Sequence, residues 1–263
     1  MLPKNGYQRK RNLFDPKSPQ PFRLSRSRLE NFLGCPRCFY LDRRLGVEPP
    51  GIPAFTLNSA VDALLKTEFD LYRRQKKPHP IMEQFGVKAI PFIHPQLDEW
   101  RENFKGVQFH HRETNLIVTG AVDDLWVDPS SGDVFVVDYK ATSTEGRISL
   151  DQEYRQAYKR QMEIYQWLLR KNGLNVNAVG YFVYCNADKS KPLFSSKLEF
   201  SIEVIPYEGN DGWVEDAVLR AHRCLMGPRL PESAENCEYC QYRRLSFSME
   251  NPRSEASAQG ELF

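Results

Sequence analysis

Apolar residues recur at helical spacing in four stretches of the chain, at about residues 25–33, 57–72, 152–171 and 213–225. Four shorter apolar stretches have the length and composition of β-strands, at residues 116–127, 134–139, 179–185 and 198–205. Residues 128–133 separate the first two strands and contain Pro129 and Gly132, which predicts the turn of a hairpin. This mixture of helices and strands predicts an α/β fold.

The two ends of the chain have a different composition from the middle. Residues 1–24 are rich in Lys, Arg and Pro and show no apolar period, which predicts a flexible basic arm. Residues 247–263 are mostly small and polar, which predicts a disordered tail. Between them, residues 25–246 are expected to form one domain, with a helical insertion near residues 57–112.

Charge and hydropathy indicate the location of the protein better than they indicate its function. The chain has 36 Lys and Arg against 34 Asp and Glu, so its net charge points to no particular partner. The basic residues are concentrated in the first 45 positions, where they can neutralise phosphates. No stretch approaches the roughly 18 consecutive apolar residues of a membrane span, and the beginning of the chain lacks the apolar segment of a secretory signal. We therefore expect a cytoplasmic protein without a membrane partner.

The candidate chemistry lies on the predicted hairpin. Asp123 follows Gly120 near the end of the first strand, and the second strand ends in Asp138, Tyr139 and Lys140. Strand side chains alternate in direction, so Asp138 and Lys140 share a face and Tyr139 points to the other. If the hairpin brings Asp123 beside Asp138, two carboxylates and an ammonium surround one point. That set suits Mg²⁺-assisted phosphodiester hydrolysis, whereas the simpler interpretation is a surface ion pair at a strand end.

A buried glutamine adds a second signal. Gln161 falls within the apolar stripe of the predicted helix at 152–171, one turn before Tyr165. A glutamine that faces the core must find hydrogen-bond partners or destabilise the fold. The sequence therefore predicts polar contacts between this helix and its neighbours, which an ordinary core glutamine would also explain.

These residues occur in an order that resembles a known family. Gly120 and Asp123, then Asp138-Tyr139-Lys140, then Gln161 and Tyr165 are similar to the successive motifs of the RecB-like branch of the PD-(D/E)XK nucleases. The resemblance extends over residues 25–246 and implies a restriction-endonuclease-like core, in which helices flank a central mixed β-sheet. It further implies that Asp123, Asp138 and the Tyr139 carbonyl bind Mg²⁺ or Mn²⁺, and that Lys140 is catalytic. Gln161 and Tyr165 would support the site or contact DNA.

The chain departs from this branch at one metal ligand. Members usually carry a histidine on an earlier helix, but the corresponding helix here reads Asn58-Ser59-Ala60-Val61-Asp62. Asp62 is the candidate replacement, and Glu68 is a second one. An oxygen ligand in that place would favour Mg²⁺ or Mn²⁺.

Four of the six cysteines form two Cys-x-x-Cys pairs, Cys35/Cys38 and Cys237/Cys240. In a cytoplasmic protein such pairs indicate a metal site before they indicate disulfides, and four thiolates suit tetrahedral zinc or a [4Fe–4S] cluster. Cys185 and Cys224 lie in apolar stretches and are expected to be ordinary core residues.

The same resemblance bears on which metal the cysteines bind. Several RecB-like nucleases, among them CRISPR-associated exonucleases, join one early cysteine and three late ones around an iron–sulfur cluster. Here the last expected cysteine is missing, near Ser246, and Cys38 is the candidate substitute. On this basis the iron–sulfur cluster is the first expectation, at the edge of the α/β core, and zinc is the alternative.

The last five residues, Gln259-Gly260-Glu261-Leu262-Phe263, resemble the short peptide by which bacterial replication and repair proteins bind the sliding clamp. The residues that would make the contact are Gln259, Leu262 and Phe263. Exposed Leu and Phe in a polar tail are explained if the segment becomes ordered in a partner's pocket.

Together these features predict a metal-dependent deoxyribonuclease that acts as an exonuclease or on single-stranded DNA and free ends. The resemblance places it in DNA repair, recombination or defence. Two alternatives remain at this level: a non-catalytic DNA-binding module with a structural metal, and a nuclease that cleaves RNA.

Overall fold

The computed structural model describes residues 8–49, 51, 55–152 and 155–251, which form two compact units. The sheet unit comprises residues 23–26 and the described part of 52–216. The terminal unit combines the described residues of 1–22, 27–51 and 217–263. Each unit is described by itself below.

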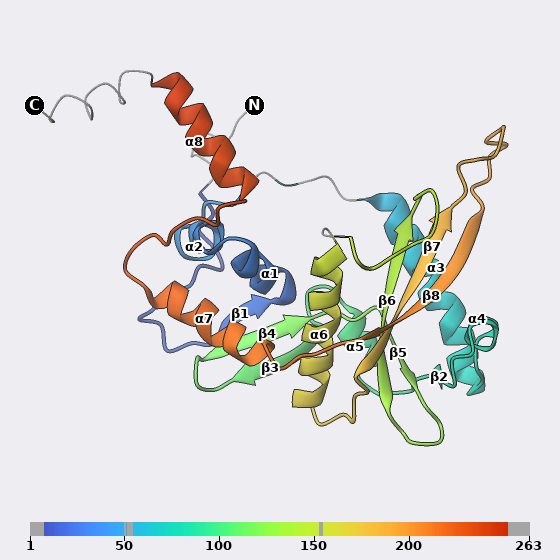
Figure 1. Cartoon of the computed structure of the whole chain (residues 1–263). Helices are drawn as coiled ribbons and strands as arrows, with labels where there is room; N and C mark the ends of the chain where they lie inside the picture. The colour runs from blue at the N-terminus through green and yellow to red at the C-terminus, as the bar shows by residue number, and fades with distance from the viewer. Residues whose placement is uncertain (1–7, 50, 52–54, 153–154, 252–263) are drawn as a thin grey trace, which may run out of the picture. The chain divides into compact units, whose positions relative to one another are not determined.

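The sheet unit holds most of the regular structure (Figure 1). Its helices are α3 (Thr56–Gln75), α4 (Pro80–Gln84), α5 (Leu97–Arg101) and α6 (Gln156–Lys171). Its strands are β1 (Phe22–Ser25, from Arg23 onward), β2 (Ile90–Pro91), β3 (Val107–His111), β4 (Leu116–Gly120), β5 (Asp124–Val127), β6 (Val134–Thr142), β7 (Val179–Ala187) and β8 (Phe200–Glu208).

The larger sheet of this unit has five strands in the order β2-β5-β6-β7-β8. Only β6 and β7 run parallel, and the other neighbours are antiparallel. The connection between β6 and β7 contains α6, as a parallel pair requires. A central mixed sheet flanked by helices is therefore present, which confirms the expected fold class. A second sheet of three strands has the order β1-β4-β3.

The five-stranded sheet lies between α3 and α6 (Figure 1). On the α3 side, Phe69 packs with Trp126, Val137 and Tyr139 in the main apolar cluster. Tyr139 and Val137 face this cluster, so the alternation of a strand turns Asp138 toward α6. The centre of β6 is consequently buried on both faces, which explains its nearly continuous apolar sequence.

The first predicted strand, residues 116–127, is wrong as a single element. The chain forms β4 up to Gly120, leaves the sheet at residues 121–123, and re-enters a different sheet as β5. Apolar patterning continues across the break because Val122 is buried as well. The period alone therefore gave no sign that the strand changes sheets.

The terminal unit consists of α1 (Arg26–Gly34, from Ser27 onward), α2 (Pro36–Leu45), α7 (Val214–Met226, from Ala217 onward) and α8 (Glu238–Glu250). Its buried apolar residues include Leu29 and Phe32 of α1, Phe39 of α2 and Leu225 of α7. In α8, by contrast, Cys240 is the only buried residue.

The described parts of the chain ends are more ordered than their composition predicted. Phe14 is buried, and the backbone of Arg9 donates a hydrogen bond to the Gly46 carbonyl at 2.7 Å. At the other end α8 continues to Glu250, past the expected start of the tail. The clamp-binding residues Gln259, Leu262 and Phe263 lie outside the described residues. Among the described helices, none combines the length and apolar character that crossing a membrane requires.

Candidate functional site

Asp138 and Lys140 lie on the α6 side of β6. Asp138 is fully buried, and its carboxylate forms an ion pair with the Lys140 ammonium. Burial raises the pKa of Asp138 to about 6, although the charge of Lys140 opposes the shift. Burial also opposes the charge on Lys140, but the carboxylates of Asp138 and Asp123 outweigh it and raise the pKa of the ammonium. The two charges thus compensate each other at the centre of the sheet.

Asp123 occupies the break between β4 and β5. The antiparallel register pairs Asp124 with Val137, so Asp123 lies across from Asp138 at the start of β5. Its side chain accepts a hydrogen bond of 2.9 Å from the Tyr139 backbone N–H. The close approach that the hairpin predicts between Asp123 and the Asp138–Lys140 segment is therefore present in the structure.

The third carboxylate comes from α3. The Lys66 ammonium lies 2.8 Å from Asp62 and 3.7 Å from Asp123, so it bridges the two acids. Burial, and then the charge of Asp123, raise the pKa of Asp62, although Lys66 opposes the shift. Glu68, the other candidate, is directed elsewhere and contacts His79 at 3.0 Å.

Lys66 is a site residue that the sequence analysis missed. It follows Asp62 by four residues, so the helical period places both on one face of α3. That spacing was visible in the sequence, but such pairs are common on exposed helices. Only the contact with Asp123 distinguishes Lys66 from an ordinary surface lysine.

Gln161 and Tyr165 connect α6 to the acids. The Gln161 amide donates hydrogen bonds to Asp138 at 2.7 Å and to the Tyr165 hydroxyl at 3.1 Å. Gly120 completes this contact, since a Cβ atom there would lie only 2.7 Å from the Tyr165 ring. The three motif segments therefore meet in space, and the glycine has a steric reason to be there.

Two further side chains lie around Lys140. Its ammonium lies 4.6 Å from the centre of the Tyr158 ring, a cation–π contact from the first turn of α6. Arg26 adds positive charge and opposes the raised pKa of Asp138. Neither residue belongs to a motif, so no sequence pattern singled it out.

Asp124 has a different role from its neighbour in the chain. It is fully buried on the α3 side, where Arg73 and Arg101 form ion pairs with it. The Tyr139 hydroxyl donates to the same carboxylate at 2.7 Å. This network fixes the start of β5 and the middle of β6, and it thereby positions Asp123 and Asp138.

The donor set of this site fits a hard divalent cation. Asp62, Asp123 and Asp138 supply carboxylate oxygens, the ligands that Mg²⁺ and Mn²⁺ prefer. One oxygen of Asp138 is buried without a geometrically regular hydrogen bond among the described residues, and Lys140 forms the ion pair with it. The acids do not form as tight a cage as the cysteines do among the described side chains. Mg²⁺ commonly binds one or two carboxylates and completes its shell with water and substrate phosphate.

The four cysteines of the Cys-x-x-Cys pairs converge in the terminal unit, with all sulfur atoms within 4.8 Å of one another. Cys38 Sγ lies 3.5 Å from Cys240 Sγ and 3.6 Å from Cys237 Sγ. Burial raises the pKa of Cys35, but hydrogen bonds from backbone groups of Cys38 and Ala234 outweigh it and lower that pKa to about 7. The residue types and the spacing of the cluster fit a metal site.

The remaining two cysteines lie outside the cluster. Cys185 is buried in the apolar core of the sheet unit, and Cys224 is half-buried in α7. Burial raises the pKa of both thiols to about 11, which suits unreactive packing residues.

Comparison with known proteins agrees with this geometry. No curated protein matches the chain. The family model of the PD-(D/E)XK nuclease superfamily matches residues 56–245, which is well over half of the chain and includes every acid and lysine described above. Members of this superfamily are usually metal-dependent nucleases, which the carboxylate and lysine arrangement suits. The chain belongs to the PD-(D/E)XK nuclease superfamily.

Proposed function

We propose that this chain is a Mg²⁺- or Mn²⁺-dependent deoxyribonuclease of the RecB-like branch, acting on single-stranded DNA or free ends. The observation that carries the proposal is one connected set of contacts. Asp123 contacts β6 beside Asp138, Lys140 pairs with Asp138, and Gln161 holds Asp138 from α6. A buried acid–lysine pair costs desolvation free energy, so its presence is best explained by a function.

The proposed metal ligands are Asp62, Asp123, Asp138 and the backbone carbonyl of Tyr139. A divalent cation held there would neutralise phosphate charge and lower the pKa of a water molecule. The Tyr139 side chain has a separate task, since its hydroxyl is anchored to Asp124 on the opposite face.

The surrounding side chains have distinct tasks in the proposal. Lys140 keeps its proton, as its raised pKa requires, and is placed to stabilise negative charge on the phosphate or to orient a water molecule. Gln161 is a positioning residue that fixes one oxygen of Asp138 and, with Tyr165, keeps α6 against the site. Lys66 holds Asp62 and Asp123 together in the absence of a cation.

The partner and the pathway rest on the resemblance to RecB-like nucleases alone. The proposed pathway is DNA repair, recombination or defence in the cytoplasm. The proposed partner is the bacterial sliding clamp, bound through Gln259, Leu262 and Phe263. Deleting residues 259–263 should abolish binding to immobilised clamp, and an intact chain that does not bind would end that part of the proposal.

The rival functions differ in their substrates. A non-catalytic DNA-binding module would bind DNA without cleaving it, and an RNA-directed nuclease would cleave RNA in preference. The first is disfavoured by the conjunction of Asp138, Lys140 and Gln161, because binding alone needs no such set. The second shares the same chemistry and is separated only by the substrate.

The test is cleavage of end-labelled single- and double-stranded DNA and RNA of one sequence, with and without Mn²⁺. We expect Mn²⁺-dependent cleavage of DNA that is lost in Asp138→Asn and Lys140→Met. Lys197→Met, which changes an exposed lysine of the β7–β8 connection, is the matched control and should retain activity. Cleavage of RNA alone, or activity that survives in Lys140→Met, would contradict the proposal.

A further inference from the structure

The separation of the cysteine sulfurs distinguishes between the metals that four thiolates can bind. Three measured separations are 3.5, 3.6 and 3.9 Å, for Cys38–Cys240, Cys38–Cys237 and Cys35–Cys240. Zinc–sulfur bonds of about 2.3 Å in a tetrahedron place the sulfurs roughly 3.8 Å apart. The observed spacing therefore fits four thiolates around one ion.

The same spacing does not fit a [4Fe–4S] cluster. In such a cluster each cysteine binds a different iron atom, and irons and sulfides fill the space between the thiolates. The cysteine sulfurs must then lie much further apart than they do around a single ion. With all four within 4.8 Å of one another, the backbone would have to open before a cluster could enter.

The local structure also provides for the negative charge of four thiolates. Cys35 is the N-cap of α2, and Cys237 is the N-cap of α8. The Cys35 sulfur interacts with backbone groups of Cys38 and Ala234, and the Cys237 side chain makes no capping hydrogen bond, so both sulfurs lie at helix N-termini. The positive ends of two helix dipoles thus lie at the cluster and stabilise thiolates there.

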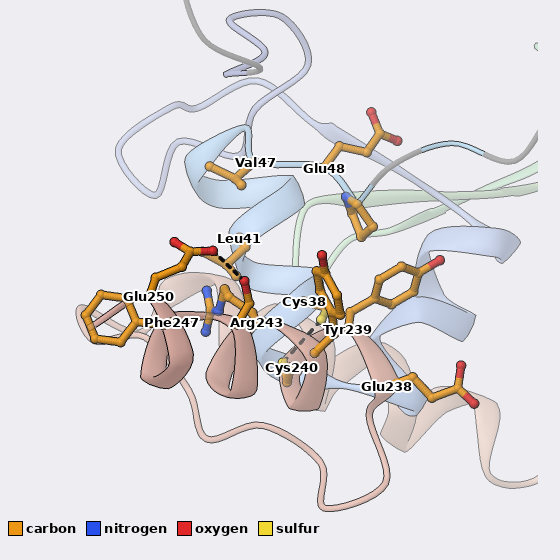
Figure 2. Close-up of a pocket in the computed structure, with 13 residues that line it drawn as sticks. Cys38, Leu41, Val47, Glu48, Glu238, Tyr239, Cys240, Arg243, Phe247 and Glu250 are labelled. Atoms are coloured by element: carbon orange, nitrogen blue, oxygen red, sulfur yellow. Dashed lines mark hydrogen bonds between the residues drawn. The ribbon is translucent and has the colours of Figure 1, made fainter. Parts of the chain in front are cut away.

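The way α8 is held shows what a metal would do. Its one buried residue is the ligand Cys240, whereas Tyr242 is 76% exposed and Phe247 is 61% exposed. A groove of about 640 Å³ is lined by residues of α8, of α2 and of the segment 47–49. Figure 2 shows Cys38 and Cys240 facing each other beside this groove. Cysteine sulfurs make the close side-chain contacts that are described between the two helices.

We propose that Cys35, Cys38, Cys237 and Cys240 bind a single structural zinc ion, and that this ion fastens α8 to α2. Four protein ligands leave no open coordination position, so the zinc has a structural role and no part in cleavage. This inference stands independently of the proposed nuclease function, since the cysteines and the helices that they join all lie within the terminal unit.

The first experiment measures metal and sulfide in the full chain as purified. We expect about one zinc per chain, little iron, no acid-labile sulfide and a colourless protein. Cys237→Ser should lose the zinc, and Cys237→His should retain it, because Cys₃His is also a zinc-binding set. Cys224→Ser is the matched control in the same unit and should keep full zinc. Stoichiometric iron and sulfide in a brown protein would overturn the proposal.

The second experiment follows α8 itself. Arg243 and Arg244 lie in the middle of this helix, so trypsin can cut there only when α8 unfolds locally. We expect removal of zinc by a strong chelator to speed cleavage at these arginines by about tenfold or more, with protection restored by added Zn²⁺. Identical cleavage rates with and without zinc would show that the ion does not hold α8.

Discussion

The carboxylate site and the cysteine cluster differ in how the charge of their acidic groups is compensated and in how closely their ligand atoms are spaced. At the carboxylate site, the ammonium groups of Lys66 and Lys140 form ion pairs with Asp62, Asp123 and Asp138. At the cysteine cluster no side-chain cation pairs with the sulfurs among the described contacts, and the four ligand atoms already lie at the spacing of one ion.

The difference follows from what each site has to do. A catalytic cation must exchange ligands with water and substrate, so a loose set of hard oxygens and nearby ammonium groups suits it. A structural ion must not exchange, so four soft thiolates that enclose it suit that role. The two sites should therefore respond in opposite ways to metal removal and to mutation.

Treatment with a chelator is expected to have the largest effect on cleavage. Brief treatment with a weak chelator should abolish cleavage completely and reversibly, because Mg²⁺ or Mn²⁺ binds through few protein ligands. The same treatment should leave the zinc content and the trypsin resistance of α8 unchanged. Cleavage and zinc are measured on one sample, and simultaneous loss of both would mean that the two sites do not differ in this way.

The next prediction separates two neighbouring acids. Asp123→Asn should reduce cleavage by more than about 100-fold, since even partners of a metal ligand contribute about 10- to 100-fold. Asp124→Asn should instead lower the free energy of unfolding by roughly 3–5 kcal/mol, because it breaks a buried network with two arginines. Urea denaturation and cleavage rates of both variants test the distinction, which fails if Asp123→Asn proves the less stable protein.

Substitutions of Asp62 test whether this aspartate replaces the histidine ligand that RecB-like nucleases usually carry. Asp62→Asn should weaken Mn²⁺ binding by about 10- to 100-fold, as expected for loss of one ligand among several. Asp62→His should recover part of the affinity, because imidazole also binds Mn²⁺, with Mg²⁺ supporting cleavage less well. Titration of Mn²⁺ against activity measures both effects. Unchanged Mn²⁺ dependence in Asp62→Asn would remove Asp62 from the proposed ligands.

The smallest effect is expected at Gly120. An alanine there would push its methyl group against the Tyr165 ring and displace the side chain that Gln161 contacts. We expect Gly120→Ala to lower cleavage by about tenfold, since small shifts in positioning groups are costly. Gly34→Ala, in α1, adds a methyl group where nothing lies within 4 Å and the backbone is not left-handed, so it is a control for the effect of an added methyl group on folding. Equal activity in both variants would deny Gly120 a role in the site.

Much of the sheet unit could be predicted from local patterns. The long helices α3 and α6 and the strands β6 and β7 follow from apolar periodicity within a few residues, as does α7 of the terminal unit. The alternation of a strand placed Asp138 and Lys140 on one face and Tyr139 on the other, which the contacts of these residues agree with. Residues 74–112 have no clear apolar period. In this segment β3 pairs with β4, and α5 has only five residues, too few to show a helical period.

What the sequence determined by itself is the chemistry: the order of the motifs, the alternation that puts Asp138 and Lys140 on one face of a strand, and two Cys-x-x-Cys pairs. These features are local, because residue types and their spacing can be read directly from the amino-acid sequence. The tertiary structure decided the rest: the change of sheet at Asp123, the Lys66 bridge, the buried partners of Asp124 and the distances between sulfurs. Each of these depends on segments far apart in the chain, as with Cys38 and Cys237 at a separation of 199 residues. Such distances are set by how helices and sheets pack, and local patterns do not encode them.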